Sequence, residues 1–290
     1  MRICLAFVML AACSKPQDVA TPVAPTPLAA PAPVATDIEL PGDANGVVWD
    51  AAEHALYFAD DAKASLMRWT QKDGFTVVAA LPAPGSKVSF GGLVRQPDGS
   101  FVIASFGFGT DGTVLVVDAK HETHEVPNLD KNRRRVGIAR GPDGALYVAY
   151  FTVIGHDHKG GLAKLDLAKG ETDLAMANLV KPVGVAATAG GVFVADQESN
   201  TVYALRAGAV TSYATGLQSA DLLTVLPDGS LVTGGKAGVV SKIGIDGRVT
   251  IVAQGFDQVR GIAYDPDGKR LFVVDHSKAA PHRLHIVALP

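Results

Sequence analysis

Short apolar runs occur along this chain in pairs, and a tight turn separates the two runs of each pair. In VGIARGPDGALYVAY, residues 136–150, the turn is Pro142-Asp143-Gly144. Its glycine supplies the positive φ that a tight hairpin needs, and its proline and aspartate favour the first turn positions. Two strands joined by so short a turn must be antiparallel neighbours. The pattern occurs six times, and the second runs end at Asp60, Ser105, Tyr150, Asp196, Gly235 and Asp275.

These ends are separated by 45, 45, 46, 39 and 40 residues, and a third apolar run follows each pair. A repeat near forty residues that carries several short strands is typical of propeller blades. We therefore predict an all-β fold, a six-bladed β-propeller with four-stranded blades that occupies residues 37–290. The sixth copy reaches Pro290 without room for a fourth strand. The segment from Asp37 to Leu40 is predicted to complete that blade and close the ring, which removes open sheet edges.

The residues before the ring have a different composition. Residues 1–12 begin with a positive charge at Arg2 and continue in an apolar run too short to span a bilayer, which predicts a signal peptide. Leu10-Ala11-Ala12-Cys13 resembles the bacterial lipobox, in which the cysteine is lipidated. An ordinary secretory signal with an incidental cysteine is the alternative. Residues 13–36 are rich in proline and alanine and predict a semi-rigid tether.

These segments predict a lipoprotein of the bacterial cell envelope, held on the lipid bilayer through Cys13 and facing the periplasm. Serine rather than aspartate at position 14 resembles the outer-membrane sorting pattern, so the outer membrane is the predicted location. Cys4 would leave with the signal peptide, and the mature chain would then contain no disulfide. The formal net charge of −3 gives no electrostatic footprint for nucleic acid. We expect a monomer.

The alternation of antiparallel strands determines which residues share a face of the ring. Residues before each first strand and after each second strand lie on one face, and the Pro-Asp-Gly turns lie on the other. We predict a ligand-binding mouth at the centre of the first face. Its mixed charges suit a small polar ligand or a periplasmic protein partner. The candidate ligand-binding residues are Asn45, Asp60, Arg133, Arg135, Tyr150, Asp196, Asp221, Arg260 and Asp275.

Several of these residues have a structural interpretation as well. Asp60, Asp196 and Asp275 end strands, where a carboxylate commonly accepts N–H bonds from the following turn. The run of arginines at residues 133–135 also fits a solvated loop.

Residues 151–160 are interpreted as the longest loop on the predicted binding face. His156 and His158 in it could bind a metal from an extended segment, with a solvated loop as the alternative. Phe106, Phe108 and Tyr150 are candidates for an apolar wall or for ordinary packing. The sequence contains no Gly-x-Ser-x-Gly nucleophile motif.

Two segments resemble one known family. NGVVWD at residues 45–50, followed by LYFAD at residues 56–60, is similar to the opening blade of the SMP-30/gluconolactonase/LRE-like family. NRRRVG at residues 132–137 stands where that family has an Asn-Arg-x-Asn-Asp-Gly segment. The fourth copy, with VAD at residues 194–196 and Asn200, also resembles the NHL-type repeat. Members of the family are six-bladed propellers, and several are divalent-metal lactonases.

The resemblance implies a metal site at the axis, but the chain departs from the family's ligands. The first ligand, a glutamate, is Asn45 here, and the family's asparagine is Val183. The aspartate is kept as Asp221. Asn45 and Asp221 are therefore the candidate ligands for calcium, zinc or manganese, and so few oxygens predict weak binding. In the substrate-binding segment Arg133 is matched, whereas the asparagine and aspartate become Arg135 and Val136.

Two hypotheses of different class follow. The first is a non-catalytic propeller that binds a small polar ligand or a protein partner at its mouth, with a degenerate metal site. The second is a divalent-metal-dependent lactonase or ester hydrolase, in which the metal activates a water molecule. His156 and His158 with an axial aspartate would be a different ligand set for such an enzyme. The loss of family ligands favours the binding protein.

Overall fold

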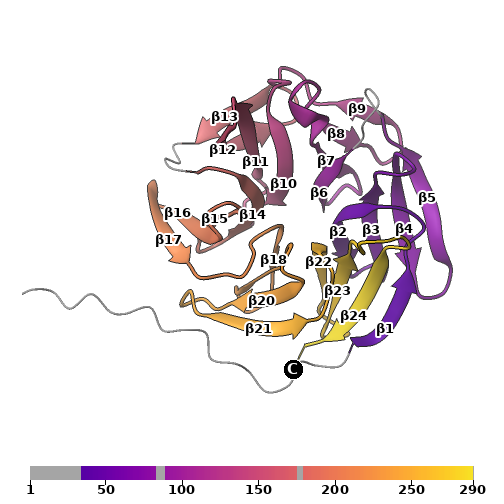
Figure 1. The fold of residues 1–290 in the computed structure, drawn as a ribbon. Helices are drawn as coiled ribbons and strands as arrows, with labels where there is room; N and C mark the ends of the chain where they lie inside the picture. The colour runs from indigo at the N-terminus through magenta and orange to yellow at the C-terminus, as the bar shows by residue number, and fades with distance from the viewer. Residues whose placement is uncertain (1–33, 83–88, 175–178, 290) are drawn as a thin grey trace, which may run out of the picture.

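The computed structural model describes residues 34–82, 89–174 and 179–289, and they form six four-stranded antiparallel sheets around a central axis (Figure 1). The prediction of a six-bladed propeller is confirmed. The predicted signal peptide, Cys13 and most of the predicted tether lie outside the described residues. Among the residues that are described, no helix is long and apolar enough to cross a bilayer.

The first strand of each blade is nearest the axis, and the others follow outward. Blade 1 contains β2 (Ala44–Asp50), β3 (Ala55–Asp60), β4 (Ser65–Thr70) and β5 (Gly74–Ala80). Blade 2 contains β6 (Phe90–Arg95), β7 (Phe101–Ser105), β8 (Thr113–Val117) and β9 (Thr123–Glu125), with the short 3-10 helix η1 (Gly107–Gly109) between β7 and β8. Blade 3 contains β10 (Arg134–Arg140), β11 (Leu146–Ile154), β12 (Asp157–Asp166) and β13 (Gly170–Leu174).

The remaining blades repeat this arrangement, and the last is completed from the start of the chain. Blade 4 contains β14 (Pro182–Thr188), β15 (Gly191–Asp196), β16 (Thr201–Arg206) and β17 (Ala209–Ala214). Blade 5 contains β18 (Leu223–Val225), β19 (Leu231–Thr233), β20 (Val239–Ile243) and β21 (Val249–Gln254). Blade 6 contains β22 (Val259–Asp265), β23 (Arg270–Asp275), β24 (Arg283–Ala288) and β1 (Val34–Glu39).

Ring closure by the N-terminal strand is confirmed. β1 pairs antiparallel with β24, with Asp37 opposite His285 and Ile38 opposite Leu284. The strand begins at residue 34, three residues before the predicted segment, and the two ends of the ring lie side by side in Figure 1. Leu40 follows the strand and is buried, and its N–H donates to the carbonyl of His282 at 2.9 Å.

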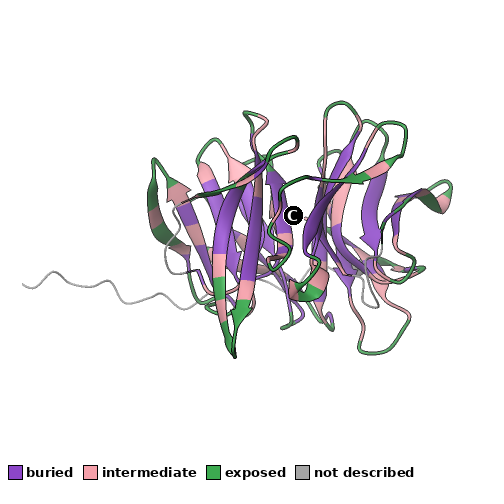
Figure 2. Cartoon of the chain, turned by 90° about the horizontal axis from the view of Figure 1, so that it is seen from above, coloured by how far each residue is buried: buried purple, intermediate pink, exposed green. Residues whose placement is uncertain are grey.

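The apolar core lies between neighbouring blades, so strands inside the ring are buried on both faces (Figure 2). Tyr57 and Leu66 of blade 1 pack in one cluster with Phe101 and Ile103 of blade 2. A second cluster spans the closure, where Ile38 of β1 packs against a core that includes Leu40, Phe58 and Phe272. Burial of these apolar surfaces is the main force that holds the blades in a ring.

The interpretation of residues 151–160 as a loop is wrong. β11 and β12 continue their pairing through these residues, from Phe151 opposite Gly160 to Ile154 opposite Asp157. Thr152, Val153 and Ile154 are β-branched and extend the strand, and Gly155 turns the chain at a φ of 64°. The segment is therefore a long hairpin that projects from the binding face.

Candidate functional site

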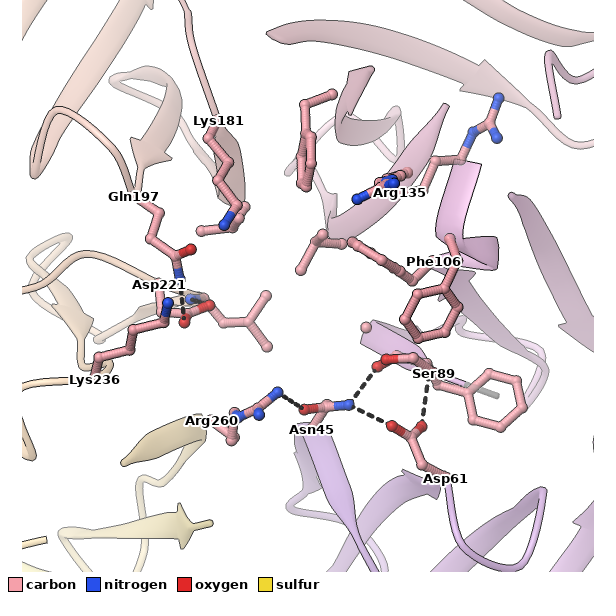
Figure 3. Close-up of a pocket in the computed structure, with 18 of the residues that line it drawn as sticks. Asn45, Asp61, Ser89, Phe106, Arg135, Lys181, Gln197, Asp221, Lys236 and Arg260 are labelled. Atoms are coloured by element: carbon pink, nitrogen blue, oxygen red, sulfur yellow. Dashed lines mark hydrogen bonds between the residues drawn. The ribbon is translucent and has the colours of Figure 1, made fainter. Parts of the chain in front are cut away.

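A cavity of about 460 Å³ lies at the axis, on the face where the innermost strands begin (Figure 3). All six blades contribute to its wall. It is lined by Asp43, Asn45, Asp61, Ser89, Phe90, Gly91, Phe106, Phe108, Arg134, Arg135, Val136, Phe151, His158, Lys181, Val183, Gln197, Asp221, Leu222, Lys236, Gln258 and Arg260.

Glycines beside the axis allow the innermost strands to converge. A Cβ atom on Gly91 would lie 2.1 Å from the carbonyl oxygen of Val136, and one on Gly261 would lie 2.1 Å from that of Asn45. Neither position has room for a side chain, because real Cβ contacts are much longer. These close approaches place the residues at the start of each blade around one small space.

Asn45 links two charged groups across the cavity wall (Figure 3). Arg260 Nη1 donates to Asn45 Oδ1 at 2.9 Å. Asn45 Nδ2 donates to Asp61 Oδ2 and to the carbonyl of Phe90, both at 2.8 Å. The side chain is buried, and both ends of its amide already have partners. Asn45 therefore behaves as the centre of a polar network that positions Arg260 at the axis.

Two carboxyl groups in the cavity have raised pKa values. Burial raises the pKa of Asp61 to about 7, and the nearby charge of Asp43 adds to this effect, whereas the Phe90 N–H opposes it. Burial also raises the pKa of Asp221 to about 6, against the opposing charge of Arg260. Asp221 Oδ2 accepts a hydrogen bond from Gln197 Nε2 at 3.0 Å, and its Oδ1 accepts one from the Leu222 N–H at 3.1 Å.

The residues at the axis do not fit the metal site of the family. Asn45 Oδ1, the oxygen that a metal would use, accepts a hydrogen bond from Arg260, which also brings a positive charge to that oxygen. Val183 has no ligand atom. Asp221 is then the one ionisable oxygen ligand of the expected set, whereas calcium takes six to eight oxygens. The histidines of the β11–β12 hairpin do not replace the set, because His156 is exposed at the turn and His158 Nδ1 contacts Glu198 Oε2 at 2.7 Å.

Three cations on another part of the wall have no salt-bridge partner within the described residues: Arg134, Lys181 and Lys236. The Arg134 guanidinium lies 5.4 Å from the ring centroid of Phe106 and 5.9 Å from that of Phe151. Lys181 Nζ lies 5.5 Å from the ring centroid of Phe151. Burial lowers the pKa of Lys181 and the positive charge of Lys236 lowers it further, whereas the charges of Asp221 and Glu198 oppose this effect. This side of the cavity therefore presents positive charge next to the partly exposed Phe106, with the buried Phe151 behind it.

The predicted strand-end aspartates cap turns and do not line the cavity. Asp60 Oδ1 accepts N–H bonds from Asp43 and Ala62. The carboxylates of Asp196 and Asp275 likewise accept backbone N–H bonds from neighbouring loops. All three side chains are buried, which matches the structural interpretation of these residues.

Arg133, Arg135 and Tyr150 belong to an ion-pair cluster of blade 3, which also contacts the carbonyl of Gly112 in blade 2. Arg135 donates to both carboxylate oxygens of Glu171, at 3.1 and 2.6 Å, and to the carbonyl of Gly112 at 2.9 Å. Its side chain contributes to the cavity wall, but its guanidinium is fully buried and engaged. Arg133 lies over the Tyr150 ring at 3.9 Å and donates to Asp173, which also accepts from the Tyr150 hydroxyl at 2.8 Å.

Of the nine predicted binding residues, the structure therefore brings Asn45, Arg135, Asp221 and Arg260 to the cavity. Sequence reasoning missed most of the other polar groups in its wall. Four residues that line the cavity but were not predicted to bind a ligand directly follow a predicted strand end: Asp61, Phe151, Gln197 and Lys236.

The chain is a closed six-bladed β-propeller with four-stranded blades and a polar cavity at its axis. The profile of the SMP-30/gluconolactonase/LRE-like region matches residues 44–236, and the chain belongs to that family. Among curated proteins, none matches this sequence.

Several solved structures share the fold. The calcium-binding protein regucalcin from Agrobacterium tumefaciens is 17% identical, with a TM-score of 0.68 over 92% of this chain and 98% of the other. A gluconolactonase from Xanthomonas campestris is 17% identical, with a TM-score of 0.66 over 84% and 85%. Virginiamycin B lyase from Staphylococcus aureus is 13% identical, with a TM-score of 0.60 over 88% and 99%. At these identities the similarity concerns the fold alone.

Proposed function

We propose that this family member is a binding protein whose central mouth holds a small organic anion with an apolar or aromatic part. The observation that carries the proposal is the group of unpaired cations, Arg134, Lys181 and Lys236, beside Phe106 and Phe151 in the cavity. Arg134 and Lys181 are partly buried, whereas Lys236 is exposed. A partly buried charge without a partner is unfavourable, and the two lysines repel one another. A bound carboxylate would relieve both costs through charge-assisted hydrogen bonds.

The shape of the mouth supports a small molecule more than a protein partner. Its volume of about 460 Å³ falls in the range of pockets that enclose small ligands, roughly 300–1,000 Å³. The apolar part of the ligand would face Phe106, and its anionic group would face the lysines. A protein partner would have to insert an acidic side chain at the same place.

Binding of benzoate and of its neutral analogue benzamide tests this proposal by calorimetry. We expect benzoate to bind at least about tenfold more tightly, because a hydrogen bond to a charged group contributes about 1.5–3 kcal/mol. Lys181→Gln and Lys236→Gln should each weaken benzoate binding by about tenfold. Lys120→Gln, at an exposed turn of blade 2, is the matched control and should leave it unchanged. Equal affinities for the two compounds, or no effect of either lysine, would refute an anion site.

A divalent-metal lactonase of the gluconolactonase type is the second candidate function. Two observations favour it: the buried Asp221 is kept in the mouth, and a gluconolactonase shares the fold. Two other observations disfavour it. Arg260 donates to Asn45 Oδ1, and position 183 is a valine.

We also propose that the protein works at the periplasmic face of the outer membrane, anchored by lipid on Cys13. The support is the sequence LAAC at residues 10–13 and the proline-rich segment that follows. The wild-type chain should partition into detergent, and Cys13→Ser should release it into the soluble fraction or stop its maturation. A soluble wild-type protein with an unmodified Cys13 would contradict the anchor.

A further inference from the structure

Two histidines and an aspartate converge where the two ends of the ring meet. Asp43 lies between β1 and β2, and His276 and His282 lie in the connection from β23 to β24. His276 Nδ1 is 2.9 Å from Asp43 Oδ1, and His282 Nε2 is 3.8 Å from the same oxygen. Within the described part of the chain, this is the one group of three or more histidine, cysteine or acidic residues whose ligand atoms all lie within 4.8 Å of one another.

We propose that Asp43, His276 and His282 bind a zinc ion. Zinc in proteins is usually tetrahedral with bonds of about 2.0–2.1 Å, which places neighbouring ligand atoms about 3.3 Å apart. The two distances from Asp43 Oδ1, 2.9 and 3.8 Å, lie on either side of that value. Three ligands from imidazole and carboxylate groups, with a fourth position left open, are a ligand set that zinc enzymes use. The inference does not depend on anion binding at the axis.

The backbone of each ligand is held by another part of the closure. The Asp43 N–H donates to Asp60 Oδ1 at 3.1 Å, and the His276 N–H donates to the carbonyl of Gln258 at 2.8 Å. The carbonyl of His282 accepts the N–H of Leu40 at 2.9 Å. These bonds reduce the ordering that an ion would have to impose on the ligands.

The ring of His282 leaves its Nε2 open to an ion, because that atom makes only the 3.8 Å approach to Asp43 Oδ1. Its Nδ1 is buried on the other side of the ring, so Nε2 is the nitrogen that would bind zinc. The ring instead stacks on His276, with centroids 4.0 Å apart and an angle of 20° between the planes. Around a shared tetrahedral ion the two centroids would separate to about 5 Å. Both side chains are partly exposed, so the rings have room to make this movement.

Zinc at this position would join the segment after β1 to the last hairpin of the chain. An ion that binds only the folded protein raises its stability. Because Asp43 also lines the axial cavity, the ion would lie at the rim of the mouth.

Calorimetry with Zn²⁺ alone tests the site in the full chain, with Cys4 and Cys13 replaced by serine so that no thiol competes. We expect one zinc ion per chain and a higher thermal midpoint in its presence. His276→Gln and His282→Gln keep a side chain of similar size, and each should weaken zinc binding at least tenfold. His124→Gln, on the outermost strand of blade 2, is the control and should bind zinc as the parent does.

Melting curves without zinc show whether each variant is folded, and the absorption spectrum of bound Co²⁺ reports tetrahedral coordination independently. Absence of zinc binding in the folded parent would overturn the proposal. Zinc binding that survives both glutamine substitutions in folded variants would overturn it as well.

Discussion

Arg135→Ala should lower the free energy of unfolding by about 3–5 kcal/mol, which is the usual cost of breaking a buried ion pair. The Arg135 side chain is fully buried, and that of its partner Glu171 is 6% exposed. The substitution removes two hydrogen bonds from Glu171 and one from the carbonyl of Gly112. Arg133 still donates to Glu171 at 2.9 Å, so the carboxylate keeps one cationic partner.

Urea unfolding measures this effect, as a lower midpoint with an unchanged slope. Replacing both partners, with Arg135→Met and Glu171→Leu, should recover much of the loss, because apolar residues of similar volume often substitute well for a buried pair. Arg248→Ala is the control: its side chain is 81% exposed and 4.0 Å from Asp246, so it should change stability by less than about 0.5 kcal/mol. A loss below about 1 kcal/mol for Arg135→Ala would show that the buried pair does not stabilise blade 3.

A chain that starts at Pro41, and so lacks β1 and Leu40, should lose more than about 4 kcal/mol of stability. Leu40 is 4% exposed and Ile38 packs in the same cluster, and burial of one such side chain contributes about 1.5–3 kcal/mol. The truncation also removes the ladder with β24 and leaves that strand as an open edge. Since whole domains are stable by about 5–15 kcal/mol, the ring should be close to unfolding.

The comparison is with a chain that starts at Val34 and therefore keeps the entire strand. Its thermal midpoint should equal that of the full chain. If the two truncated chains melted at the same temperature, β1 would not be the strand that closes the ring.

The architecture could be predicted because each sequence repeat corresponds to one blade. Each copy pairs two apolar runs around a tight turn. Positive φ occurs at Gly99, Gly144 and Gly229 of three Pro-Asp-Gly turns, and at Lys269 after the fourth. Such local signals fix the blades one by one. Ring closure followed from a missing strand in the last copy and from the cost of an open edge.

The site was harder to predict because side chains alternate in direction along an extended chain. The side chain of the last strand residue, such as Asp60 or Asp196, accepts N–H bonds from the loop that follows and caps it. The next residue, Asp61 or Gln197, faces the axis and lines the cavity. A prediction that the site residues lie one position after each strand end would have identified Asp61 and Gln197.

Other contacts have no signal in one sequence. Glu171 comes from the outermost strand of blade 3, 36 positions after its partner Arg135. Nothing in the spacing of the two residues connects them, because the contact joins the innermost and outermost strands of blade 3. The unpaired state of Lys181 and Lys236 is equally a property of the folded ring.

Titration of calcium and manganese into the full chain tests the central claim most directly, namely that Arg260 and the lysines supply positive charge at the axis, where the family resemblance implied a metal site. We predict no stoichiometric binding of either ion at the axis, benzoate binding that is unchanged by a chelator, and no hydrolysis of gluconolactone. Stoichiometric calcium or manganese together with lactone hydrolysis, both lost in Asp221→Ala, would contradict the account and establish the metal-dependent enzyme.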